Sequence, residues 1–124
     1  METRVRRLIL ELVDAYNAKD LERVMAFYHP QATYWSALGD WRRGADEIRT
    51  HIVELFELLP DEHMTVRTLI ADDTTAVAEF TGRGTAPDGR PYSLDFTEVF
   101  HLRGGKVAEV RVYLDPEEVA AALG

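Results

Sequence analysis

The sequence contains no cysteine, so the fold has neither disulfides nor a thiolate for catalysis or metal binding. Basic residues are few: 14 Lys and Arg stand against 22 Asp and Glu, and the net charge of -8 disfavours binding to nucleic acid or anionic membranes. No apolar run is long enough to predict a transmembrane helix, and none at the start of the chain predicts a signal peptide. These absences predict a cytoplasmic protein that binds neither nucleic acid nor membranes.

Sequence motifs for cofactors and metals are missing as well. The chain has no phosphate-binding loop, dinucleotide fingerprint or nucleophile elbow. The histidines fall on different predicted elements, and no pair has the spacing of a zinc site: His29, His51, His63 and His101. We therefore expect no cofactor and no metal. A composition of 46% hydrophobic and 29% charged residues over 124 positions predicts one globular domain, residues 1–124.

Three segments of the N-terminal half have the three- and four-residue apolar spacing of amphipathic helices. They are residues 4–17 with Thr3 as the expected cap, a short helix that Asp20 caps and His29-Pro30 ends, and residues 46–59. The apolar stripe of the third helix includes His51, so a histidine is predicted on its buried face. A short last helix is expected to begin at Asp115-Pro116.

Alternating apolar and β-branched residues predict strands in the rest of the chain. They cover residues 32–37, 63–71 and 75–86, followed by two strands within residues 92–115. The turn Pro87-Asp88-Gly89 has the chemistry of a three-residue hairpin loop, which pairs Ala86 with Arg90 and therefore Ala78 with Glu98.

The last hairpin turns at Arg103-Gly104-Gly105, and its register decides which way Glu98 faces. A two-residue loop would place Glu98 opposite Arg111 and match apolar faces with polar ones. A three-residue loop places Glu98 opposite Val110 and matches apolar with apolar, so we predict this register. Glu98 is then expected on an apolar sheet face, between Ala78 and Val110.

The order of elements predicts an α+β fold. A curved antiparallel (mixed) sheet should form a cone, with the three helices of the N-terminal half packed on its concave face. Such an arrangement encloses a cavity, the usual place for a small-molecule site.

Four stretches resemble the nuclear transport factor 2-like superfamily, and within it the SnoaL-like group of polyketide cyclases near ketosteroid isomerase. They are Asn17–Glu22, His29–Thr33, Gly44–Ile48 and Phe100–Val107, and the resemblance covers essentially the whole chain. It implies the cone fold and a homodimer formed through the outer sheet face. It is less specific for the reaction, because the superfamily contains enzymes, binding proteins and transport factors.

Comparison with two relatives narrows the chemistry. At the positions where ketosteroid isomerase has its tyrosine, general base and protonated acid, this chain has Leu12, Ser36 and Glu98. Limonene epoxide hydrolase would need an arginine at Phe96 and an aspartate at Val112. Both sets are incomplete, and the acid at position 98 is common to every comparison.

Two hypotheses follow. In the first, Glu98 and His51 act as acid and base on a small apolar or aromatic carbonyl compound, in an isomerisation, cyclisation or elimination. Substrate-binding residues would be Tyr34, Ser36, Trp41, Tyr16, Phe56, Phe80, Phe96 and Val110. In the second, the chain is a non-catalytic hydrophobic-ligand-binding or dimerisation domain. A cavity that holds a second polar group near Glu98 would favour the enzyme.

Overall fold

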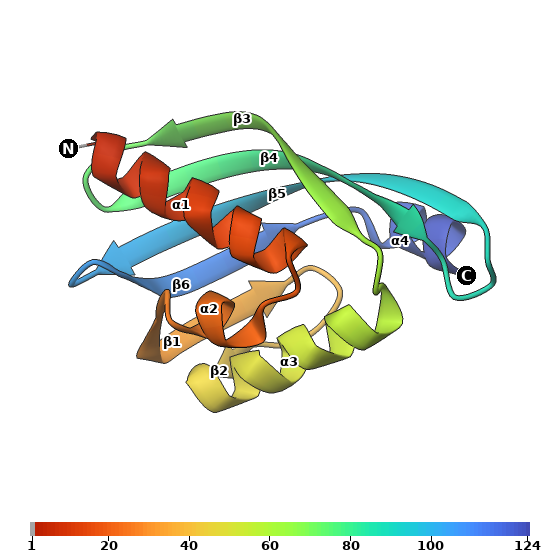
Figure 1. Cartoon of the computed structure of the whole chain (residues 1–124), viewed down its shortest axis with the longest axis horizontal. Helices are drawn as coiled ribbons and strands as arrows, with labels where there is room; N and C mark the ends of the chain where they lie inside the picture. Colours follow the sequence, from red (N-terminus) through yellow and green to blue (C-terminus); the bar gives the residue numbers. More distant parts are fainter. Residues whose placement is uncertain (1) are drawn as a thin grey trace.

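The computed structural model describes residues 2–124, with side chains from residue 4 onward. The helices are α1 (Glu2–Asn17), α2 (Leu21–Met25), α3 (Ala45–Leu58) and α4 (Pro116–Leu123). The strands are β1 (Tyr28–Ser36), β2 (Arg42–Arg43), β3 (His63–Ala71), β4 (Thr75–Thr85), β5 (Pro91–Arg103) and β6 (Lys106–Tyr113). Helices α1, α2 and α3 lie along one side of the twisted sheet (Figure 1).

The six strands form one mixed sheet in the order β2-β1-β6-β5-β4-β3. Strand β1 runs parallel to β6, and all other neighbours are antiparallel. Fully buried side chains from the sheet meet those of the helices in one core, among them Ile9, Ile48, Phe80, Phe100 and Val110. The predicted α+β cone is confirmed.

The start of the chain differs from the prediction in two places. Helix α1 already includes Thr3, which therefore does not cap it. Helix α2 ends at Met25, and His29 and Pro30 belong to β1 rather than to the end of a helix. The strand begins early because the backbone of Phe27 accepts a hydrogen bond from the Val107 amide at 2.9 Å, which pairs this segment with β6.

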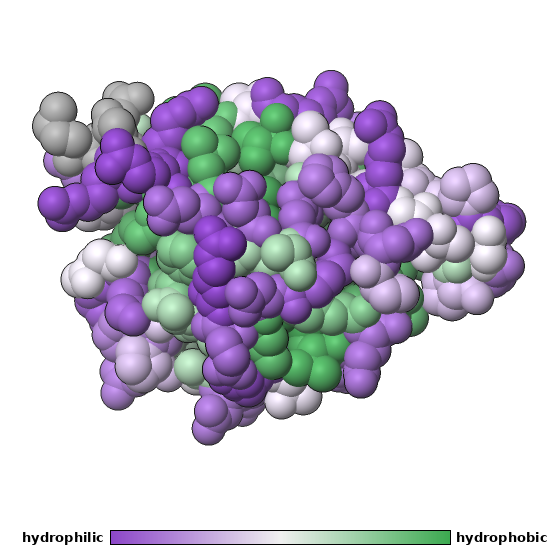
Figure 2. All heavy atoms as spheres, in the orientation of Figure 1, coloured by the Kyte–Doolittle hydropathy of each residue, from purple (hydrophilic) through white to green (hydrophobic). Residues whose placement is uncertain are grey.

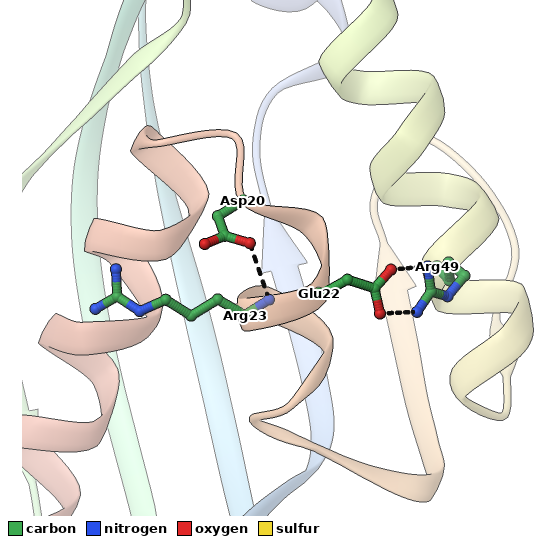
Figure 3. Close-up of polar contacts among 4 residues, drawn as sticks. All are labelled: Asp20, Glu22, Arg23 and Arg49. Atoms are coloured by element: carbon green, nitrogen blue, oxygen red, sulfur yellow. Dashed lines mark hydrogen bonds and ion pairs between the residues drawn. The ribbon is translucent and has the colours of Figure 1, made fainter.

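The short helix α2 is fixed at its N-terminal end by side chains (Figure 3). The Asp20 carboxylate caps it, as predicted, by accepting a hydrogen bond from the Arg23 amide at 3.2 Å. Glu22 accepts two hydrogen bonds from the Arg49 guanidinium at 2.6 and 2.7 Å. Because Arg49 belongs to α3, this bidentate pair joins the two helices across the surface.

The joint between α1 and α2 is attached to the beginning of β3. The Asn17 side chain donates to the Met64 carbonyl at 2.9 Å and accepts from its amide at 2.8 Å, as a neighbouring strand would. Lys19 has a left-handed backbone, with φ 57°, and its ammonium donates to the Glu62 carbonyl at 2.5 Å. This joint therefore positions the residues that lead into β3.

The hairpin of β5 and β6 has the two-residue loop rather than the predicted three-residue loop. Gly104 and Gly105 both have positive φ, 59° and 77°, as a tight primed turn requires. Arg103 then pairs with Lys106, but Ala108 is an extra residue in β6 that shifts the register before His101. The bulge restores the match of apolar faces, so that Glu98 lies opposite Val112 and not Val110.

The hairpin of β4 and β5 has the predicted register. Ala78 pairs with Glu98 and Phe80 with Phe96, and the Ala86 amide donates to the Arg90 carbonyl at 2.8 Å. Glu98 thus faces the helices from the middle of the sheet, flanked by the small side chain of Ala78 and by Val112.

Helix α4 packs beside the end of β4 and β5 farthest from the β5–β6 turn (Figure 1). Its residues Ala122 and Leu123 join a second, smaller apolar cluster with Leu59, Ala86, Tyr92 and Leu94. Among the described residues, no helix combines the length and the apolarity needed to cross a bilayer. Hydrophilic side chains dominate the view in Figure 2, with apolar residues visible between them.

Candidate functional site

A cavity of about 120 Å³ lies between the sheet and the helices. Polar and titratable side chains reach it from five elements or their ends: Tyr16, Tyr34, Ser36, His51, Glu62 and Glu98. Its remaining walls are apolar: Leu38, Leu55, Leu59, Met64, Leu94, Phe96, Val112, Leu114, Val119 and Leu123. Leu38 is 51% exposed, which places it at the rim. A second hollow of about 40 Å³ shares Tyr16, Tyr34, Met64 and Glu98 with the first.

Glu98 is the acid at the centre of this region, and it lines both hollows. No hydrogen bond or ion pair to Glu98 is present in the part of the chain that the structure describes. Burial, with the charge of Glu62 as a smaller cause, raises the pKa of Glu98 from 4.5 to about 8. Glu98 is therefore mostly protonated at pH 7 and can donate a hydrogen bond to a molecule in the cavity.

His51 lines the same cavity, as the sequence predicted, but it contacts Tyr34 rather than Glu98. The two ring centroids lie 4.9 Å apart. Burial, assisted by the positive charge of Arg42, lowers the pKa of His51 to about 4. The imidazole is thus neutral at pH 7, and it offers one donor and one acceptor to a ligand rather than a positive charge.

Two tyrosines stand close to the acid. Burial raises the pKa of Tyr16 and of Tyr34, with Glu98 contributing to both shifts and Glu62 to that of Tyr16. Both phenols therefore stay protonated. The Tyr16 ring packs edge-on against Phe56 at 5.1 Å, which fixes its orientation.

Glu62 is a cavity residue that the sequence analysis missed. It lies just before β3, and one of its carboxylate oxygens accepts a hydrogen bond from the Tyr92 hydroxyl at 2.7 Å. Burial raises the pKa of Glu62, while the Tyr92 hydrogen bond and the Lys19 charge oppose the shift. One feature of the sequence indicates space for a side chain at this place: Gly82 and Gly84 leave the part of β4 that faces Glu62 without side chains.

The other predicted ligand-binding residues divide into two groups. Ser36 and Phe96 line the main cavity, and Phe80 lines the smaller hollow. The lining does not include Phe56, Val110 or Trp41. Phe56 supports Tyr16 from behind, and Val110 is fully buried, with Val112 taking its expected place because of the bulge.

Trp41 contacts two arginines instead of the cavity, and the sequence did not predict these contacts. Its ring centre is 5.0 Å from the Arg111 guanidinium carbon and 5.6 Å from that of Arg43. Arg111 belongs to the outer face of β6, so the tryptophan is drawn to the cations of that face and away from the cavity mouth.

The chain matches a family of proteins over most of its length. A family model described as a SnoaL-like domain matches residues 9–110. No curated protein matches it.

Solved structures share the fold at low sequence identity. An NTF2-like protein of unknown function from Burkholderia pseudomallei is 22% identical, with a TM-score of 0.89 over 99% of this chain and 98% of that one. A putative SnoaL-like polyketide cyclase from Jannaschia sp. CCS1 is 20% identical, with a TM-score of 0.89 over 98% and 92%. TerC, co-crystallised with polyporic acid, is 19% identical, with a TM-score of 0.85 over 94% and 95%.

Proposed function

The chain belongs to the SnoaL-like domain family, and on that premise we propose that it is an enzyme that transfers protons on a small apolar carbonyl compound. The observation that carries the proposal is Glu98, an acid without a protein partner among the described residues, facing a cavity with apolar walls. Proton transfer in this setting covers isomerisation, cyclisation and elimination, and it needs no cofactor.

The electrostatics of Glu98 suit the role of a proton donor. With a pKa of about 8, its carboxyl group holds a proton at pH 7 and gives it up with little cost. A carbonyl oxygen next to it would accept a hydrogen bond that strengthens as negative charge develops on the oxygen. Neutral His51 and the phenols of Tyr16 and Tyr34 would orient the rest of the ligand.

The size of the cavity limits the substrate. A cavity of roughly 150 Å³ is enough for benzene, and this one measures about 120 Å³. We therefore infer a substrate whose reacting part is about one ring. The likeness to TerC, which was co-crystallised with polyporic acid, supports the binding of a small organic ligand in this fold.

The alternative is a non-catalytic domain that binds a hydrophobic ligand in the same cavity. An apolar binder needs no titratable groups inside, because each one costs free energy to bury. Glu62 and His51 accompany Glu98 in this cavity, and they favour the enzyme.

Isomerisation of cyclohex-3-enone to the conjugated cyclohex-2-enone, followed by ultraviolet absorbance, tests the proposal. We expect the protein to accelerate it and Glu98→Gln, which keeps the size but cannot exchange a carboxyl proton, to slow it about 100-fold or more. Glu54→Gln is the control, because Glu54 is exposed on α3, lines neither hollow and lies away from the outer sheet face. An unchanged rate in Glu98→Gln would contradict the role of Glu98.

We also propose that the chain forms a homodimer through the outer face of its sheet. A row of side chains crosses this face in register, from Ile70 through Val77 and Val99 to Arg111 and Trp35. Ile70 is 68% exposed, an unusual cost for an isoleucine in water. Ion pairs lie beside the row, Arg111 with Glu109 at 3.0 Å and Arg67 with Asp95 at 3.3 Å. Charges of both signs suit an interface that repeats itself about a two-fold axis.

A further inference from the structure

We propose that Glu62 is the second proton-transfer group of the cavity, taking a proton from the carbon next to the carbonyl that Glu98 holds. The inference rests on the proposed function and assigns the base that the function needs. Both carboxyl groups line the same cavity: Glu98 belongs to β5, and Glu62 belongs to the segment just before β3.

The geometry around Glu62 leaves one of its oxygens available to a ligand. Its Oε2 accepts the Tyr92 hydroxyl at 2.7 Å. Its Oε1 has no hydrogen-bond partner among the described residues. A carboxylate held through one oxygen keeps a fixed orientation, while the other oxygen can accept a proton from a substrate.

The sheet makes room for this acid at two glycines of β4. A Cβ atom at Gly82 would lie 3.2 Å from Glu62 Oε2. A Cβ atom at Gly84 would lie 3.0 Å from the Tyr92 hydroxyl and 3.1 Å from the Glu62 Cα. Any larger residue would therefore press on the acid or on the tyrosine that holds it.

The joint after α1 fixes the backbone of Glu62. Lys19 adopts a left-handed conformation in which glycine is less strained, and its ammonium binds the Glu62 carbonyl at 2.5 Å. The positive charge also favours the ionised form of the Glu62 side chain. The two acids thus have different surroundings: Glu62 has a donor and a nearby cation, whereas Glu98 has neither among the residues that the structure describes.

The proton transfers balance within the cavity. Glu62 carboxylate takes a proton from the carbon beside the carbonyl, and the electrons of that C–H bond form a carbon–carbon double bond. The carbonyl π electrons move to the oxygen, which receives the Glu98 proton, giving an enol. Glu62 then returns its proton to another carbon of the conjugated system, and Glu98 recovers its own from the enol oxygen. Both residues end in their starting states.

Several groups face this pair from the elements packed around it. They are Tyr16 and Lys19 from the first helix and its joint, Tyr28 and Tyr34 from β1, His51 from α3, Asp61 beside Glu62, and Tyr92 from β5. The phenols and the imidazole are uncharged at pH 7. Burial raises the pKa of both carboxyl groups, so among the described cavity-lining groups these two govern the pH dependence of the proposed reaction.

The test is the pH dependence of cyclohex-3-enone isomerisation from pH 5 to pH 9. We expect a bell-shaped rate, falling at low pH as Glu62 is protonated and at high pH as Glu98 loses its proton. Glu62→Gln, which can still accept the Tyr92 hydrogen bond, should lower the rate about 100-fold or more. Tyr92→Phe should move the acidic limb to higher pH, because the Glu62 carboxylate loses a stabilising donor.

The outcomes separate this inference from the proposed function. If Glu98→Gln is inactive while Glu62→Gln keeps the full rate and profile, Glu62 is not the base and the proposed function stands. If the unaltered protein gives no acceleration, both are wrong. Glu54→Gln is again the control. An acidic limb that does not move in Tyr92→Phe would also overturn the inference, even if Glu62→Gln failed to fold.

Discussion

The burial of Glu98 makes the unfolding free energy of the protein depend on pH. The pKa of Glu98 is about 8 in the folded protein against an ordinary value of 4.5. Between these values the unfolded chain releases the proton and the folded chain does not. Stability from this group is therefore lost as pH rises from about 5 to 8, and the loss levels off above the folded pKa.

Glu98→Gln should remove this dependence. We expect the unfolding free energy of the unaltered protein to fall, relative to the variant, by about 1.4 kcal/mol per pH unit across this range. Urea unfolding at pH 5, 6, 7 and 8 measures it, with Glu54→Gln as the exposed control. Parallel curves for the protein and Glu98→Gln would show that Glu98 titrates normally.

The sequence could predict Glu98 but not Glu62, for a physical reason. Glu98 interrupts an alternating apolar series, so its inward direction follows from strand geometry alone. Glu62 lies between Pro60 and a strand, in a segment without periodicity. Its inward direction depends on contacts with Tyr92 and Lys19, which are 30 and 43 residues away in the chain.

At the scale of secondary-structure elements, strand β4 leaves room for Asp61 and Glu62 because Gly82 and Gly84 have no side chains. Alanine at Gly84 would place its Cβ 2.9 Å from Asp61 Oδ1 and 3.1 Å from the Glu62 backbone. We expect Gly84→Ala to destabilise the protein by about 1–3 kcal/mol, as overpacked sites do. Thermal unfolding measures it.

Gly39→Ala is the matched control, because its Cβ would meet nothing closer than Arg42 at 3.8 Å. This change should be neutral or slightly stabilising, since alanine restricts the unfolded chain. Equal stability of the two variants would mean that β4 has more room than its contacts show.

The β5–β6 hairpin shows a limit of predicting strand register from the alternation of apolar residues. The rule that apolar faces must meet correctly predicted the direction of Glu98, but it does not specify how the chain achieves the match. A three-residue loop and a two-residue loop with a bulge at Ala108 both satisfy it, and they differ in whether Val110 or Val112 faces the acid. The choice depends on turn energetics at Gly104 and Gly105.

At the scale of the whole molecule, the exposed row on the outer sheet face predicts the oligomeric state. We expect the protein to sediment at twice its chain mass of 14.1 kDa. Ile70→Glu should give monomers, because it buries a charge in the interface while its site in the single chain is 68% exposed. Leu58→Glu, on the helix side and 49% exposed, should leave the dimer intact. A monomeric unaltered protein at 100 µM (about 1.4 mg/ml) would contradict the proposal.

Helix α4 closes one side of the cavity with Val119 and Leu123, and it has only eight residues. A helix this short is marginal on its own in water, so we expect it to open more readily than the sheet beneath it. The residence time of a bound molecule would then follow the opening rate of α4. A substitution at Leu123 would change how long a product stays, while the acids beneath continue to set how fast it forms.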